Sequence, residues 1–253
     1  MIVARDLAPA QLDSVLGRTS PVLKLAIAVG WFVGLATTTA LVPPLVVVVT
    51  AALAGFTLGK VPLADFVRAV APIWIAAVGL ATFNTLFAAA NADPVTATIA
   101  QVGPLRIAGP ALAAGVGLGL RLVAVGAVGA VFVLTTDSTR LVDALVQQAG
   151  VSSRFAYGAL AAYQAVPRFG EDLTTLRQAR RLRGIRGGWH PRLLVSLLVL
   201  AIRHGDRVAL AMDARAFGSG PRSRYRVVRW GLSDVVVGGG ALIVLVGALA
   251  AGR

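Results

Sequence analysis

Five long apolar stretches, with one basic block set among them, constrain this chain more than any other feature of its sequence. A membrane-spanning helix needs about 20 mostly apolar residues. Stretches of that kind occupy residues 22–40, 41–58, 70–90, 111–135 and 230–251. Only 14% of the 253 residues are charged, whereas a typical soluble domain carries about 25%. The sequence therefore predicts an all-α, polytopic membrane protein with about five transmembrane helices, and it argues against a soluble enzyme.

The basic block lies between the fourth and fifth apolar stretches. Residues 168–229 hold fourteen of the 24 basic residues and only four acidic ones, a net charge of +10. Cytoplasmic loops of membrane proteins carry an excess of lysine and arginine. A nucleic-acid-binding domain would also be basic, but it would not normally be embedded between membrane spans. We therefore expect a cytoplasmic region, a lipid bilayer as partner, and no nucleic acid.

The short loops predict the orientation. The segments expected on the cytoplasmic side carry Arg5, Arg18, Lys24, Lys60 and Arg68. The hairpin at 41–44 has no charge and the loop at 91–110 has no net charge. By the positive-inside rule, we expect a multi-pass plasma-membrane protein with the N-terminus and residues 136–229 in the cytoplasm, and Arg253 outside.

The same patterns divide the chain into three expected regions. Residues 1–135 form an N-terminal tail and a four-helix membrane region, 136–229 a cytoplasmic helical region, and 230–253 a C-terminal transmembrane helix. Capping residues from Asp137 precede an amphipathic helix that Gly150 ends. The apolar run 155–166 is too short to span a bilayer, so we expect a short helix at the membrane face that Pro167 kinks or ends.

A polar helix is expected next at 168–183, stopped by Gly184, Gly187 and Gly188. A second helix is expected from 191 to about 217, closing at Gly218, with an apolar stretch at 193–202 that is too short to span a bilayer. They end in similar triplets, Leu182-Arg183-Gly184 and Ala214-Arg215-Ala216. One interpretation is an ordinary helix end, where arginine meets the negative pole of the helix dipole. The other is a thin tip whose guanidinium enters a groove and binds a carboxylate with forked hydrogen bonds.

In these motifs the sequence resembles a known family, the transmembrane T component of energy-coupling factor (ECF) transporters. Residues 178–184 and 209–218 resemble the family's two Ala-Arg-Gly-type motifs. Further similarity is found at 20–25, 135–137, 141–145 and 166–169. The departures are Leu182, where alanine is usual, and Ala216, where glycine or serine is usual.

The resemblance implies a membrane scaffold with two long cytoplasmic coupling helices. Their ends dock on two ATP-binding-cassette (ABC) subunits, and a separate membrane S component captures a vitamin or a transition-metal ion. The implied docking residues are Leu182, Arg183, Gly184, Ala214, Arg215 and Ala216. The chain itself would be a non-catalytic subunit without a cofactor.

Residue types that carry chemistry are scarce. Residues 55–61 do not form a phosphate loop, because the spacing is one residue short and Val61 replaces the required serine or threonine. The chain has no cysteine, and His190 and His204 lack a third ligand nearby, so we expect no metal site. Two rival functions stay open: a phospholipid-head-group transferase, suggested by Asp213-Ala214-Arg215, and a conventional ABC importer permease.

Two features of the fourth apolar stretch remain. Arg121 lies within it, and charges inside spans are costly and often functional. The alternative is that the span begins near Arg121 and leaves 110–120 as an interfacial or broken helix. Gly115 and Gly119 are four residues apart, a spacing that allows close packing of membrane helices.

Overall fold

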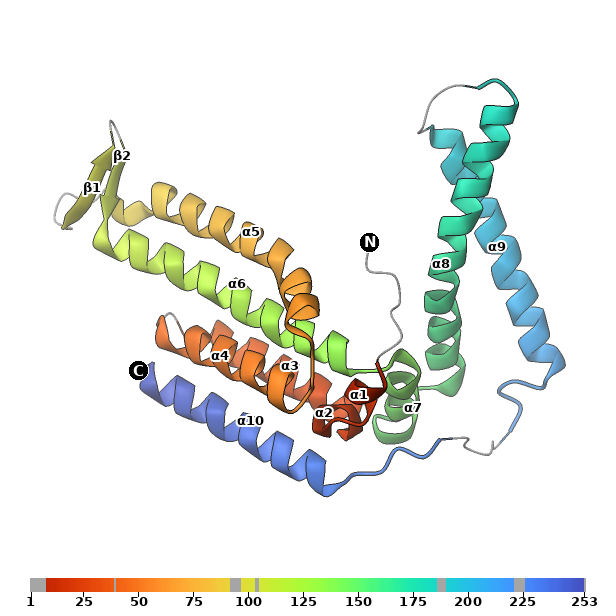
Figure 1. Ribbon diagram of the computed structural model, residues 1–253, viewed down its shortest axis with the longest axis horizontal. Coiled ribbons are helices and arrows are strands. Elements are labelled where there is room, and N and C mark those ends of the chain that lie inside the picture. The colour runs from red at the N-terminus through yellow and green to blue at the C-terminus, as the bar shows by residue number, and fades with distance from the viewer. Residues whose placement is uncertain are drawn as a thin grey trace. The chain divides into compact units, whose positions relative to one another are not determined.

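The computed structural model describes residues 8–38, 40–91, 97–102, 105–185, 190–220 and 226–252. Gly187, Gly188 and Arg253 lie outside this part of the chain. The prediction of an all-α membrane protein is confirmed (Figure 1). The helices are α1 Pro9–Leu12, α2 Val15–Arg18, α3 Pro21–Ala36, α4 Val42–Thr57, α5 Leu63–Phe87, α6 Gly109–Thr135, α7 Ser138–Gln148, α8 Ser153–Leu182, α9 Pro191–Ala214 and α10 Leu232–Ala251.

The segment between α5 and α6 contains an unpredicted element. A 3-10 turn, η1 (Ala89–Asn91), is followed by the antiparallel strands β1 (Thr98–Val102) and β2 (Leu105–Ala108). The alternation of apolar and polar residues in this segment is too short to predict the hairpin. It is a small addition to a helical fold and carries none of the predicted site residues.

The described residues divide into two compact units. The apolar unit comprises residues 8–137 and 229–252, and the basic unit comprises residues 138–228. The apolar unit contains α1 to α6 and α10, and the basic unit contains α7, α8 and α9.

The five apolar helices appear where the sequence predicts them, but they differ in length. The stretches Leu63–Asn91, Gly109–Thr135 and Leu232–Ala251 are long and apolar enough to cross a membrane. The other two, α3 and α4, have 16 residues each, or about 24 Å at 1.5 Å per residue. That length is shorter than the roughly 30 Å hydrocarbon core of a typical bilayer.

The most extensive helix pairing in the apolar unit is α5 with α6, and glycine makes a close approach possible. A methyl group at Gly115 would meet the hydroxyl of Thr85 at 2.1 Å, and one at Gly119 would meet the carbonyl of Ala77 at 3.1 Å. Both partners lie on α5. The predicted role of these two glycines in close helix packing is therefore confirmed.

The core of the apolar unit is formed by α3, α4 and α6. Its buried side chains are Trp31, Leu35, Val47, Ala51, Ala124 and Ala127. The indole of Trp31 donates a 3.1 Å hydrogen bond to the carbonyl of Ala241 on α10. This bond satisfies the polar edge of a buried ring and ties the C-terminal helix to α3.

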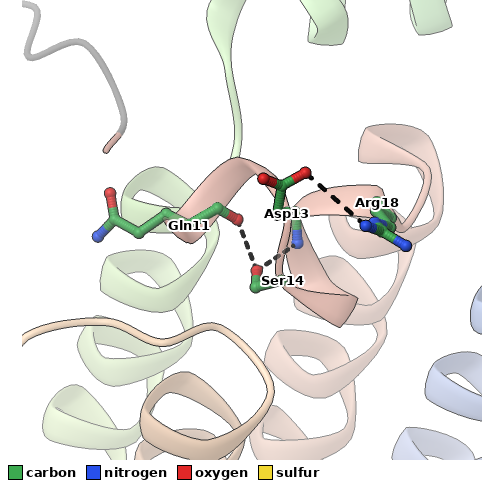
Figure 2. Close-up of polar contacts among 5 residues, drawn as sticks. Gln11, Asp13, Ser14 and Arg18 are labelled. Carbon is green, nitrogen blue, oxygen red and sulfur yellow. Dashed lines mark hydrogen bonds and ion pairs between the residues drawn. The ribbon is translucent and has the colours of Figure 1, made fainter. Parts of the chain in front are cut away.

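The N-terminal segment folds into two single-turn helices instead of a plain tail (Figure 2). Ser14 caps α2: its hydroxyl donates to the carbonyl of Gln11 at 2.6 Å and accepts from the amide of Gly17 at 2.9 Å. The amide of Leu16 donates to the carbonyl of Leu58 at 3.1 Å, just after α4. Arg18 forms an exposed ion pair with Asp13 at 3.7 Å. The segment is thereby docked on the apolar unit.

In the basic unit, the amphipathic helix expected after Asp137 is α7. The separate helix expected over 155–166 is wrong, because α8 runs from Ser153 to Leu182 with Pro167 inside it. Proline lacks the amide that would donate to the carbonyl four residues earlier. Here the loss of that one bond does not end the helix.

Helices α8 and α9 lie side by side and run in opposite directions (Figure 1). The rings of Phe169 and His204 meet edge to face with centroids 6.2 Å apart. Those of Tyr157 and Phe217 do the same at 6.3 Å. Because α8 and α9 are antiparallel, the C-terminus of each helix lies near the N-terminus of the other.

Candidate docking site

The first predicted arginine lies at the end of α8. Leu182 is the last helical residue, Arg183 is the C-cap, and Gly184 adopts a left-handed backbone with φ of 75°. The amide of Gly184 donates to the carbonyl of Arg181 at 3.0 Å, and the amide of Ile185 donates to that of Arg180 at 3.2 Å. This pair of bonds is a Schellman motif, which satisfies the last helical carbonyls.

The end of α9 repeats this geometry 32 residues later. Ala214 is the last helical residue, Arg215 is the C-cap, and Ala216 is left-handed with φ of 55°. The amides of Ala216 and Phe217 donate to the carbonyls of Asp213 and Met212 at 2.8 and 3.0 Å. The closure expected at Gly218 therefore begins two residues earlier, at an alanine in a conformation that normally favours glycine.

We call residues 182–184 the Arg183 tip and residues 214–218 the Arg215 tip. All six predicted docking residues are exposed, and Leu182 reaches 89% exposure. Because α8 and α9 are antiparallel, the tips lie at opposite ends of the pair (Figure 1). The 30 residues of α8 span about 45 Å. The structure thus brings each triplet to an equivalent place but does not bring the two triplets together.

The Arg215 tip has supporting contacts that the sequence analysis missed. Besides its ring contact with Phe217, Tyr157 donates from its hydroxyl to Oδ1 of Asp143 at 2.6 Å. The guanidinium of Arg154 donates to the carbonyl of Gly218 at 3.3 Å. The bond to the Asp143 carboxylate, together with burial, raises the pKa of Tyr157 to about 12. An aromatic residue directly after the left-handed position was the available signal, since that position often makes a hydrophobic contact.

Among the described residues, the Arg183 tip has no comparable support. The amides of residues 183–185 donate only to carbonyls of α8 itself. Ile185, which corresponds to Phe217, is 45% exposed. The two tips therefore share a backbone and differ in their surroundings.

Arg121 lies in an unbroken α6, so the interpretation of 110–120 as a broken helix is wrong. Its guanidinium donates to the carbonyl of Thr38, just beyond the end of α3. Lys24 on α3 makes the reverse contact, donating to the carbonyl of Thr135, the last residue of α6, at 2.8 Å. Each cation thus lies at the negative end of the facing helix.

Asp234 is a third charged side chain matched to helix ends. Its carboxylate accepts from the amide of Ser20, the N-cap of α3, at 2.6 Å and from that of Gly231, the N-cap of α10, at 2.7 Å. An anion is stabilised at a helix N-terminus, and here it serves two. The contacts of Arg121, Lys24 and Asp234 thus connect the ends of α3, α6 and α10 and hold these three helices in register.

The two histidines have structural contacts. His190 is the N-cap of α9, where Nδ1 accepts from the amide of Arg192 at 3.1 Å. His204 packs on Phe169. Within the described residues, no group of three histidine or acidic side chains is placed to hold a metal ion.

These elements define a class of protein: an all-α membrane protein with a compact apolar unit and a pair of long antiparallel helices that end in matching arginine-bearing tips. Comparison with known proteins gives the family. The family model CbiQ, described as a cobalt transport protein, matches residues 13–226, and the chain belongs to that family. It is also 25% identical over 196 residues to the energy-coupling factor transporter transmembrane protein EcfT of Listeria innocua serovar 6a, covering 69% of this chain and 71% of the relative.

Proposed function

We propose that this chain is the coupling subunit of an ECF-type ABC importer. It transmits ATP-driven motion from two ATPase subunits to a separate membrane component that captures the substrate, a vitamin or a transition-metal ion. Membership of a transport-protein family and the relationship to a T component support the transport role. The ATPase subunits hydrolyse the nucleotide, and this chain has no catalytic role.

The observation that carries the proposal is the equivalence of the two tips. A pair of ATPase subunits offers two equivalent grooves, and one chain can fill both only with two separate tips. Both helix ends present an exposed arginine at the same C-cap position of the same backbone motif. A guanidinium can form two parallel hydrogen bonds with a carboxylate, which gives such a contact both strength and direction.

The test is retention of the ATPases by arginine variants of the purified complex. Arg183→Ala and Arg215→Ala should each reduce ATPase retention and substrate uptake, and the double variant should abolish both. Truncating one partner of a buried, hydrogen-bonded charge pair costs about 2–5 kcal/mol, which corresponds to a loss of affinity of tens- to thousands-fold. Arg215→Lys should rescue poorly because lysine lacks the fork.

Matched controls are Arg180→Ala on α8 and Arg207→Ala on α9. Both residues contribute to the basic charge of their helices, but neither is a C-cap. They should leave retention nearly unchanged at physiological salt. If the double variant Arg183→Ala/Arg215→Ala retains the ATPases at wild-type strength, both arginines are ordinary helix caps and the docking assignment is wrong.

The proposed orientation places the N-terminus and residues 136–229 in the cytoplasm and the C-terminus outside. The charge difference between successive loops supports it. The chain is naturally free of cysteine, so Arg180→Cys is a clean probe. An impermeant thiol reagent should label this variant in inverted vesicles and not in intact cells. Labelling in intact cells would contradict the orientation.

The need for a partner ATPase as the energy source distinguishes the proposed function from the alternative functions. The purified chain alone should show no ATP hydrolysis, and uptake should stop when the partner ATPase is inactivated. Uptake that continues without any ATPase would indicate an ion-driven carrier instead. A transferase would show activity toward phospholipid head groups in the chain alone, and a conventional permease would assemble with a second permease subunit.

A further inference from the structure

The contacts beneath the Arg215 tip form a connected set. The carboxylate of Asp143 on α7 accepts the Tyr157 hydroxyl at 2.6 Å, and the Tyr157 ring meets Phe217 edge to face, with an angle of 81° between the rings. Arg154 adds the 3.3 Å bond to the carbonyl of Gly218. Asp143 is 8% exposed and Tyr157 is half-buried, so this hydroxyl–carboxylate bond is partly shielded from water. The set reaches from a buried carboxylate to the two residues that follow the docking triplet.

Helix α7 also holds the chain farther along. The side-chain amide of Gln147 donates to the carbonyl of Arg226 at 2.8 Å and accepts from the amide of Val228 at 3.0 Å. Gln148 reaches the carbonyl of Val228 at 3.5 Å. Helix α7 thus contacts the chain that follows α9 at two described places: indirectly at Phe217, through Tyr157, and directly at Arg226 and Val228.

We infer that α7 and the first turns of α8 form a clamp that fixes the Arg215 tip before any ATPase binds. The inference rests on the proposed docking role of Arg215. Asp143 and Tyr157 are positioning residues, since they act on Arg215 through Phe217. The Arg183 tip, for which the described residues show no such clamp, becomes fixed only when it docks. The two tips therefore differ in how ordered they are before an ATPase binds, even though their backbone motif is the same.

The physical reason for this inequality is conformational entropy. Fixing the backbone of a residue has an entropic cost, and a tip that is already ordered does not incur that cost on binding. Clamping therefore raises the affinity of the Arg215 contact without adding any contact to the partner. Weakening the clamp lowers affinity although every docking residue is retained.

Spin labels at matched positions test the clamp in the full-length chain without ATPases. Arg181→Cys and Asp213→Cys each place the label two residues before the docking arginine, and both positions are exposed. We expect the label at 213 to be immobilised and the label at 181 to be mobile. Tyr157→Phe, which removes only the hydroxyl, should mobilise the label at 213 and leave the label at 181 unchanged.

ATPase retention provides the second measurement. Without spin labels, Tyr157→Phe should weaken retention by about tenfold, the effect expected for losing a hydrogen bond to a charged acceptor. Asp143→Asn keeps an acceptor oxygen and should retain most of the binding, whereas Asp143→Leu should not. Tyr163→Phe on the same helix is the matched control, because its hydroxyl is not part of the contact set, and it should have no effect.

The clamp is overturned if the label at 213 is as mobile as that at 181 in the wild-type chain. It is equally overturned if Tyr157→Phe changes neither label mobility nor retention. Failure of the docking proposal looks different: Arg215→Ala would then leave retention unchanged while the label at 213 still responds to Tyr157→Phe. The two ideas are therefore tested separately.

Discussion

The two arginine-bearing tips share one backbone motif and have different surroundings. At both ends, arginine is the C-cap and the next residue is left-handed, with a φ of 75° at Gly184 and 55° at Ala216. One tip has Phe217 against Tyr157, whereas the other has the exposed Ile185. The comparison teaches that a helix end is built from a few neighbouring residues, whereas its fixed position depends on segments distant in sequence.

Removing the aromatic ring of Phe217 should have the largest effect on the difference between the two tips. Phe217→Ala should destabilise the Arg215 tip by about 2 kcal/mol, because a partly buried ring loses its apolar area and its edge-to-face partner. Amide exchange at 212–218 should then become more than tenfold faster. Ile185→Ala is the matched change at the other tip and should alter exchange there by no more than about twofold, because its side chain is already exposed. Equal effects at both tips would remove the distinction.

The glycines offer a second comparison. Gly184→Ala should cost about 1 kcal/mol, since a left-handed backbone is unfavourable for alanine and the added methyl group meets no other atom within 4 Å. Gly218→Ala should cost more, because its φ is 83° and the methyl group must also displace the Arg154 side chain. Gly205→Ala inside α9 is the control, and it should stabilise the helix by about 0.5–1 kcal/mol. Hydrogen exchange of the two helix ends measures all three changes.

A third substitution should make the two backbones more alike. Ala216→Gly removes the left-handed strain and should stabilise the Arg215 tip by about 1 kcal/mol, slowing amide exchange at 214–218 several-fold. ATPase retention should stay the same or increase. Faster exchange in this variant would show that the alanine conformation is not a source of strain.

The smallest expected effect is the loss of the Tyr157–Asp143 hydrogen bond when Tyr157 ionises in strong alkali. The Asp143 carboxylate raises the pKa of Tyr157 to about 12, so the neutral phenol is favoured in the folded state. Its stabilising contribution is complete below the ordinary tyrosine pKa of about 10 and is lost as the pH rises from there to about 12. Absorbance titration should show Tyr157 ionising only as the pH approaches about 12, and Asp143→Asn should lower its pKa. An unchanged titration in that variant would contradict the assigned bond.

The apolar helices were predictable to within a few residues at most ends because hydropathy alone defines them. The start of α5 was not, since Arg68 and Asp65 made its first turns look like a loop. The similarity of the two arginine triplets was also predictable, because Gly184 and the small residues around Arg215 mark helix ends. Ala216 was not recognised as the left-handed residue, since its sequence neighbour Gly218 offered the conventional signal.

The support beneath the Arg215 tip could not be predicted from local patterns. Tyr157 and Asp143 are 14 residues apart and separated by a turn, and Phe217 lies in the turn that follows α9. Their meeting depends on the antiparallel pairing of α8 and α9, which required α8 to continue through Pro167. The sequence favoured an interruption there, so the residue pairing across the two helices remained hidden.

The reciprocal contacts of Lys24 and Arg121 have a consequence for how this chain can change. Fourteen positions separate Lys24 from Thr38 on one side, and fourteen separate Arg121 from Thr135 on the other. Inserting one residue into either segment would advance its helix by about 1.5 Å and rotate it by about 100°, which would move a cation away from its carbonyl. Both contacts are therefore kept only when the two segments change length together, by the same number of residues.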